Sequence, residues 1–296
     1  MALKKKTARK SAKKTSSKPL PKASKKEVQT QKLTATRFQS GPMIRSFVSP
    51  KHTGPIPLRI LWIPGLGGDR AMFAKIIDHI SGSCLHPIRH SFLEYPNVGV
   101  GEVDSLESLA SLLSQAILPD EPYDMVIGYS MGGMLLQILR MKGSLHAETF
   151  VLIASGYSGK HTTTFLNGVG AFTLSKVPVI ARSFIQKMLA RLYPVLRMNI
   201  SDSKEYGAMI NRCCKTVFFE GGSWVRKWQG VPEPFYSDCL SIHGSCDPIL
   251  SFTKVSKTKE PDLTIEKGSH ILFATHSKEI ADFLLPVLNQ LVKAHT

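Results

Sequence analysis

Residues 125–141, MVIGYSMGGMLLQILRM, decide the architecture of this 296-residue chain. The first four residues are apolar or small and predict the end of a buried strand, whereas the run from about Met131 predicts an apolar helix. Residues 128–132 between them read Gly-Tyr-Ser-Met-Gly. A serine on so sharp a strand-to-helix turn takes strained backbone angles, and the positions two before and two after it must lack bulk for the turn to close. We therefore predict that Ser130 is presented at the end of a strand, beside the free N–H groups of a helix.

Strands and helices alternate on both sides of this stretch. We expect strands at 59–63, 86–93, 148–154, 238–243 and 263–266, and helices at 70–80, 103–117, 172–192 and 278–294. This alternation with short links predicts an α/β fold, with a mostly parallel sheet and helices on both faces. The rhythm stops near residue 156 and returns near 237. Residues 157–236 are therefore predicted to form a helical cap inserted between the core segments 57–156 and 237–296.

The amino-acid composition argues against a membrane-spanning segment, a secretory signal and a structural metal site. Apolar residues make up 43% of the chain, and no apolar run approaches the roughly 20 residues needed to span a bilayer. The basic start has no apolar segment, so no secretory signal is expected. The five cysteines include no Cys-x-x-Cys pair, which favours reduced thiols in a cytoplasmic protein without a structural metal or cofactor.

The net charge of +16 is unevenly distributed. Residues 1–33 carry 12 Lys/Arg and one acid, a net +11, and residues 157–236 carry 11 Lys/Arg and four acids, a net +7. The first segment has almost nothing to bury and is predicted to be a disordered basic tail, followed by a linker at 34–56. The tail could be a solvated segment without a specific partner. It could instead make weak, salt-sensitive contacts with nucleic acid or an anionic membrane. A third alternative is that it directs organelle import or nuclear location.

Two further residues complete a catalytic arrangement with Ser130. A serine hydroxyl is a poor nucleophile unless a histidine takes its proton and a carboxylate orients that histidine. Ligands bind beyond the carboxyl ends of parallel strands, and Asp247 and His270 each follow a predicted strand there. The order Ser130, Asp247, His270 is typical of a Gly-x-Ser-x-Gly enzyme. The rival acid, Asp238, begins a strand, and the rival base, His276, belongs to the last helix region; His243 is interpreted as structural.

The remaining parts of the predicted site are less specific. Oxyanion donors are expected at the backbone N–H of Met131 and of Leu66, which lies in the glycine-rich loop after the strand at 59–63. Met188, Trp224 and Trp228 of the cap are candidate pocket-lining residues, although such residues more often form cap core. The positive charge of the cap could steer an anionic, carrier-bound substrate toward the site, or could be an idle solvated surface.

Four motifs carry a family resemblance over about residues 57–293. They are IPGLGGD (63–69), GYSMGG (128–133), IHGSCDPI (242–249) and GSHILF (268–273), and in this order they resemble the α/β-hydrolase superfamily. The first usually reads His-Gly in that superfamily, and Pro64 replaces the histidine here. Within it, the chain is similar to capped carboxylesterases and to pimeloyl-carrier-protein methyl ester esterases. It has some likeness to the menaquinone-pathway lyases, but these carry Arg where this chain has Met134.

These residues and the resemblance lead to one functional expectation. The chain is expected to hydrolyse a carboxylic ester or thioester of a small molecule through an acyl-enzyme on Ser130, without a cofactor. A lyase or acyltransferase that uses the same three residues is an alternative. Another is a non-catalytic binding protein whose basic tail contacts nucleic acid or membrane.

Overall fold

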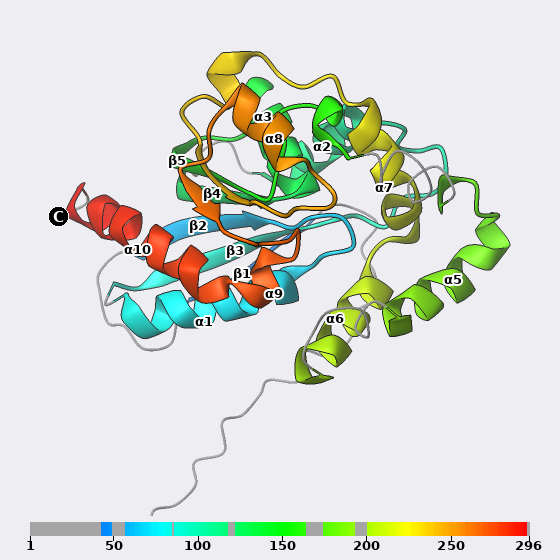
Figure 1. Ribbon diagram of the computed structural model, residues 1–296, viewed down its shortest axis with the longest axis horizontal. Coiled ribbons are helices and arrows are strands. Elements are labelled where there is room, and N and C mark those ends of the chain that lie inside the picture. The colour runs from blue at the N-terminus through cyan, green and yellow to red at the C-terminus, as the bar shows by residue number, and fades with distance from the viewer. Residues whose placement is uncertain are drawn as a thin grey trace, which may run out of the picture. The chain divides into compact units, whose positions relative to one another are not determined.

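A computed structural model describes residues 43–48, 57–84, 86–117, 122–163, 174–192 and 200–294. A seven-stranded sheet, in the order β1-β3-β2-β4-β5-β6-β7, forms its centre (Figure 1). The strands are β1 (Met43–Val48), β2 (Leu58–Ile63), β3 (Ile88–Glu94), β4 (Tyr123–Tyr129), β5 (Ala147–Ile153), β6 (Leu240–Gly244) and β7 (Leu263–Ile265). All neighbours pair in parallel except β1, which is antiparallel to β3. The predicted tail lies outside the described residues.

Helices cover both faces of the sheet, as predicted. Those that follow the core strands are α1 (Ala74–Ser83), α2 (Leu106–Leu113), α3 (Met131–Met141), α8 (Phe252–Thr258), α9 (Leu272–Thr275) and α10 (Ser277–Ala294). One core cluster holds side chains of α2, α3 and α8, and a second holds those of α1, α9 and α10, so each group packs on its own face (Figure 1). Every residue of the central strand β4 is buried. This architecture confirms the predicted α/β-hydrolase fold class.

A helical insertion, defined here as the chain between β5 and β6, occupies the place of the predicted cap. Its described helices include α5 (Val179–Leu192), α6 (Ile200–Arg212) and α7 (Lys215–Lys227). Side chains of the insertion are buried in both core clusters. Trp224 and Trp228 pack in the cluster that contains α2 and α3. Tyr206 and Met209 pack in the cluster that contains α1, α9 and α10. No described helix is both long enough and apolar enough to cross a membrane.

Several predicted boundaries differ from the structure. Strand β1 lies inside the predicted linker at 34–56, where its mostly exposed sequence gave little pattern to detect. It is held by pairing with β3, including an ion pair between Arg45 and Glu94 at 2.9 Å. The helix predicted at 103–117 begins only at Leu106 because Ser105 caps it, accepting from the N–H of Ser108. The helix predicted at 70–80 divides into a 3₁₀ turn at Arg70–Phe73 and α1.

Buried histidines make the fold sensitive to acid. His90 accepts a hydrogen bond from the indole N–H of Trp62 at Nδ1 (3.1 Å), and His161 accepts one from the Tyr157 N–H at Nδ1 (3.0 Å). Burial lowers the pKa of His90 from 6.5 to about 4, and burial, helped by Lys254, does the same for His161. Both are therefore neutral in the native state at pH 5, whereas the unfolded chain protonates them.

We expect the free energy of unfolding to fall as the pH is lowered from 6.5 to about 4. The unfolded state binds more protons than the native state in this window, so each histidine contributes a loss of up to about 3 kcal/mol. Urea unfolding at pH 7, 5.5 and 4.5 measures this slope. His90→Asn keeps an acceptor for Trp62 but cannot be protonated, and we expect a shallower slope for this variant. An identical slope for the wild type and His90→Asn would contradict the assignment.

Candidate active site

Ser130 lies on a strained turn between β4 and α3. Its backbone angles, φ 52° and ψ −119°, fall in a region that L-residues rarely occupy. The turn is held by a hydrogen bond from the Ser130 N–H to the carbonyl of Ile153 at 2.8 Å. A Cβ on Gly128 would lie 2.5 Å from the Cα of Gly133, and a Cβ on Gly132 would lie 2.1 Å from the carbonyl oxygen of Ile63. The bulk-free positions predicted from the sequence are thus places of close backbone approach.

Gly132→Ala is expected to destabilise the fold by about 3 kcal/mol or more, because the added methyl group meets backbone that cannot move aside alone. Gly82→Ala is the matched control, since a Cβ on this helical glycine has no atom within 4 Å. That variant should gain up to about 1 kcal/mol from helix propensity. Chemical denaturation measures both, and a free energy of unfolding unchanged in Gly132→Ala would contradict the packing described.

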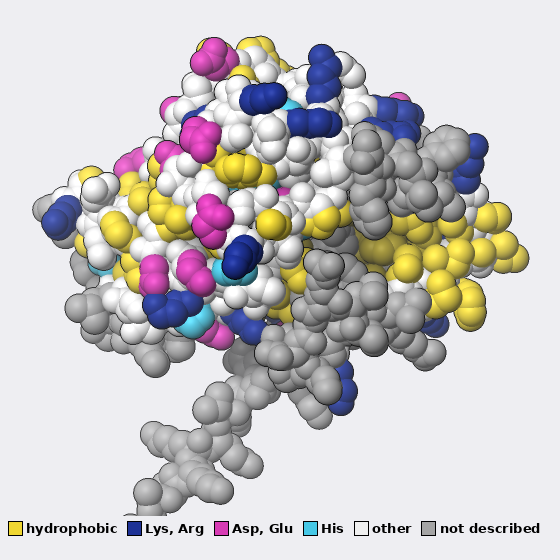
Figure 2. All heavy atoms as spheres, viewed as in Figure 1, with side chains coloured by type: hydrophobic (Ala, Val, Ile, Leu, Met, Phe, Trp, Pro, Cys, Tyr) yellow, Lys and Arg dark blue, Asp and Glu magenta, His cyan; other side chains and the backbone are white. Residues whose placement is uncertain are grey.

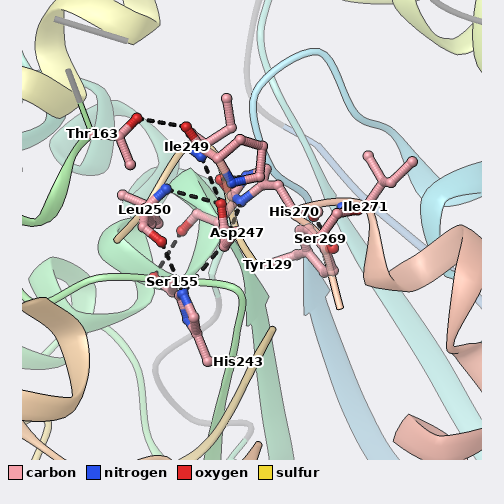
Figure 3. Close-up of polar contacts among 12 residues, drawn as sticks. Tyr129, Ser155, Thr163, His243, Asp247, Ile249, Leu250, Ser269, His270 and Ile271 are labelled. Carbon is pink, nitrogen blue, oxygen red and sulfur yellow. Dashed lines mark hydrogen bonds and ion pairs between the residues drawn. The ribbon is translucent and has the colours of Figure 1, made fainter. Parts of the chain in front are cut away.

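The three predicted catalytic residues come together at the carboxyl end of the sheet. Figure 3 shows two of them, Asp247 and His270, side by side. His270 is in the loop after β7. Its Nε2 lies 2.8 Å from the Oγ of Ser130, and its Nδ1 lies 2.7 Å from Oδ2 of Asp247. Asp247 is in the loop after β6. An ionised carboxylate can only accept, so Nδ1 carries the proton and Nε2 is left to accept from the serine hydroxyl. This arrangement links the hydroxyl to the carboxylate through one imidazole.

Asp247 is held as a buried carboxylate by its own loop. Its Oδ1 accepts from the N–H groups of Ile249 (2.7 Å) and Leu250 (2.9 Å), as Figure 3 shows. Burial by itself raises the pKa of the Asp247 carboxyl, but its interactions with His270, His243 and the Leu250 N–H together outweigh burial and hold that pKa below its ordinary value. The carboxylate is therefore ionised at neutral pH.

Three neighbours of the site were not predicted as parts of it. The hydroxyl of Tyr129 donates to the carbonyl of His270 at 2.6 Å, and its ring lies edge-on to the imidazole. Ser155, just after β5, donates to the carbonyl of Ser130 at 2.9 Å. His243 lies 3.5 Å from Asp247 and contacts the Leu250 carbonyl. The position of Ser155 directly after a strand was the available signal, whereas nothing in the sequence marks Tyr129.

The glycine-rich loop after β2 lies against the nucleophile. A Cβ on Gly65 would be 3.1 Å from the Cβ of Ser130. The side chains of Leu66 and Met131 both reach α7, where a Cβ on Gly221 would lie 2.6 Å from Leu66 Cδ1 and 3.3 Å from Met131 Sδ. Among the hydrogen bonds of the described residues, none uses the backbone N–H of Leu66 or Met131. These two N–H groups remain our candidates for binding an oxyanion.

The same loop is braced from its other side. Tyr95 donates its hydroxyl to the carbonyl of Pro64, the residue that stands where the resembled superfamily usually has histidine. Burial raises the pKa of Tyr95 well above its ordinary value, so this hydroxyl stays protonated and remains a donor. The ring of Phe218, on α7, covers Gly67, at 3.3 Å from the position of an added Cβ. The loop is therefore fixed between Tyr95 and α7.

The rival residues lie apart from Ser130. His276 is half-buried, and its Nδ1 lies 2.7 Å from the hydroxyl of Thr275. Asp238 forms an ion pair with Arg140, which lowers the pKa of the aspartate. Neither is hydrogen-bonded to Ser130 or His270 in the described part of the chain.

The three predicted pocket residues differ in burial, and the two tryptophans share a core cluster with Met131. Trp224 and Trp228 are core residues, 4% and 3% exposed, whereas Met188 is 42% exposed on α5. A cavity of about 470 Å³ lies elsewhere, between β1, α1 and α6. Within the described residues, no group of three or more His, Cys, Asp or Glu side chains could hold a metal ion.

Comparison with known proteins identifies the fold. It does not identify the reaction, which has to be inferred from the residues of the site. No family model and no curated protein matches the sequence. Solved structures that resemble it include a carboxylesterase of the ammonia-oxidizing thaumarchaeon Nitrososphaera gargenis (TM-score 0.65, 15% identity, covering 86% of this chain and 97% of that one). A thermophilic esterase from Thermogutta terrifontis matches with a TM-score of 0.61 at 13% identity, covering 84% and 93% of the two chains. MenH from S. aureus matches with a TM-score of 0.60 at 11% identity, covering 84% and 98%.

Proposed function

We propose that this chain, which has the α/β-hydrolase fold, is a serine hydrolase that cleaves a carboxylic ester or thioester. The observation that carries the proposal is the linked hydrogen-bond pair from Ser130 through His270 to Asp247, on a strained turn after the central strand. Structural likeness to esterases supports the same reaction class. The insertion between β5 and β6 takes the role of a cap in this proposal.

The proposed reaction begins with proton transfer from Ser130 to Nε2 of His270 as the Oγ attacks the substrate carbonyl. The imidazolium that forms is stabilised by the ionised Asp247, which remains a carboxylate throughout. His270 then returns the proton to the leaving alcohol or thiol, and an acyl-enzyme remains on Ser130. In the second half, His270 takes a proton from water as the water oxygen attacks the acyl carbon. The bond from that carbon to Oγ then breaks, His270 returns the proton to Oγ of Ser130, and the carboxylic acid is released.

The negative charge of each tetrahedral intermediate is proposed to rest on the N–H groups of Met131 and Leu66. Met131 is the first residue of α3, so the positive end of the helix dipole reinforces its N–H. The Leu66 N–H is held in position because Tyr95 and α7 fix its loop. An acyl thioester on a carrier is one version of the substrate, because the cations of residues 157–236 would attract its negative charge.

Hydrolysis of p-nitrophenyl esters of increasing acyl length tests the proposed reaction class. We expect turnover by the full chain, with one preferred acyl length that sizes the acyl site. Parallel assays with an acyl-CoA thioester separate ester from thioester preference. Absence of turnover on every ester and thioester, in protein that is folded by circular dichroism, would contradict the proposed hydrolase.

A further inference from the structure

Helix α5 presents its apolar side to solvent and its polar side to the protein. Ile180, Phe184 and Met188 recur every four residues and are 94%, 72% and 42% exposed, and Val179 beside them is 63% exposed. Arg182 and Gln186 also lie four residues apart, on the opposite side, and are 4% and 2% exposed. A helix on the surface of a globular protein usually has the reverse arrangement. We call the four exposed apolar residues (Val179, Ile180, Phe184 and Met188) the α5 ridge.

The inward polar side chains fix this orientation. Arg182 forms an ion pair with Glu220 of α7 at 2.8 Å and donates to the carbonyl of Val177. Gln186 donates to the carbonyls of Ile210 and Cys213 at 2.7 and 3.0 Å. Rotating α5 to bury its ridge would break these bonds and leave a buried charge unpaired, which is strongly unfavourable. The ridge is therefore held outward by the fold.

The sequence segment that carries the ridge has charged side chains of one sign. Residues 157–201 contain six Lys/Arg and no Asp or Glu. Lys176, before the helix, and Lys187, within it, are both exposed. Figure 2 shows hydrophobic side chains gathered over this part of the molecule, with Lys and Arg at the border. Apolar residues with a cationic border, on a helix lying at the surface, are the chemistry that binds a lipid–water interface.

We propose that the α5 ridge docks on the surface of an anionic lipid bilayer. The apolar side chains enter the boundary between headgroups and acyl chains, while Lys176 and Lys187 contact the anionic headgroups. The tail, with its net +11 in residues 1–33, supplies a second electrostatic attraction in the same chain. This docking is independent of the proposed hydrolase activity.

Charge favours a bilayer over a second copy of this chain. A symmetric contact through α5 would place the same helix opposite itself, so that Lys176 and Lys187 would face the cations of a segment, residues 157–201, that contains no Asp or Glu. A bilayer surface offers anionic headgroups beside an apolar interior and needs no preformed groove. It therefore matches both properties of the ridge at once.

Co-sedimentation of the full chain with vesicles tests the proposal. We expect binding to phosphatidylcholine vesicles that contain a quarter phosphatidylglycerol, and at least tenfold weaker binding by the double variant Ile180→Ser, Phe184→Ser. The matched control is Val100→Ser, which changes a residue 54% exposed outside the insertion and should bind like wild type. Because every variant retains the tail, equal binding by wild type and double variant would assign all binding to the tail and overturn the proposal.

A charge variant and two alternative occupants complete the test. Lys176→Glu combined with Lys187→Glu leaves the ridge intact and should also weaken binding to anionic vesicles; unchanged binding would overturn the role of charge. Light scattering measures whether a second copy of the chain binds the ridge instead. A wild type that is dimeric and a double variant that is monomeric would place another protomer on the ridge and overturn the proposal. Binding of an acidic carrier protein, lost in the double variant while vesicle binding is unchanged, would likewise overturn the proposal.

Discussion

Replacing Ser130 by alanine is expected to lower kcat for ester hydrolysis by about 10⁶, the loss seen when a catalytic serine is removed from a comparable triad. The variant loses the Oγ that we propose forms the acyl-enzyme, and neither His270 nor Asp247 can replace it. The residual rate should come from the oxyanion donors and substrate binding alone. Because Ser130 is only partly buried, truncating its side chain should leave the stability of the fold nearly unchanged.

Ser155→Ala is the matched control for this variant. Ser155 provides another hydroxyl next to the turn, but it donates to the carbonyl of Ser130 and is not hydrogen-bonded to His270. We expect a loss of no more than about tenfold, as for a lost hydrogen bond of about 1 kcal/mol. Steady-state rates with a p-nitrophenyl ester separate the two serines, and a larger loss in Ser155→Ala than in Ser130→Ala would contradict the assignment.

Replacing Asp247 by asparagine is expected to lower kcat by about 10⁴. The carbonyl oxygen of the amide can still accept from Ile249 and Leu250, so its NH₂ group is directed at Nδ1 of His270. Nδ1 must then accept, and the proton of the neutral imidazole moves to Nε2. With its proton facing Ser130, His270 can no longer act as the base.

Asp238→Asn is the control for the acid. This aspartate was the rival predicted from the sequence, and in the structure it pairs with Arg140 away from the serine. We expect its kcat to match the wild type. Equal losses in both variants would contradict the assigned role of Asp247.

The sequence predicted the central strands and the three clustered residues because both depend on local patterns. Apolar runs bounded by turns marked β2, β4 and β5, and loops after parallel strands must meet at one edge of the sheet. Asp247 and His270 could therefore be assigned although 117 and 140 residues separate them from Ser130. The backbone strain at Ser130 was also predictable, since the turn demands it.

What could not be predicted depends on contacts distant in sequence. Strand β1 has little pattern of its own and is ordered by β3. Trp224 and Trp228 were offered as pocket residues, and only packing against α2 and α3 shows them to be core. The orientation of α5 was equally hidden, because an apolar ridge normally predicts the buried side of a helix. Two buried polar anchors, Arg182 and Gln186, reverse that expectation.

The most direct test of the central claim is the site of covalent attachment. The full chain is treated with a fluorophosphonate, which reacts with an activated serine, and the labelled peptide is identified by mass spectrometry. We predict one phosphonyl group on Ser130, and no label in Asp247→Asn over the same time because His270 can no longer activate the hydroxyl. Labelling of a different serine, or equal labelling rates in the wild type and Asp247→Asn, would contradict the proposed triad.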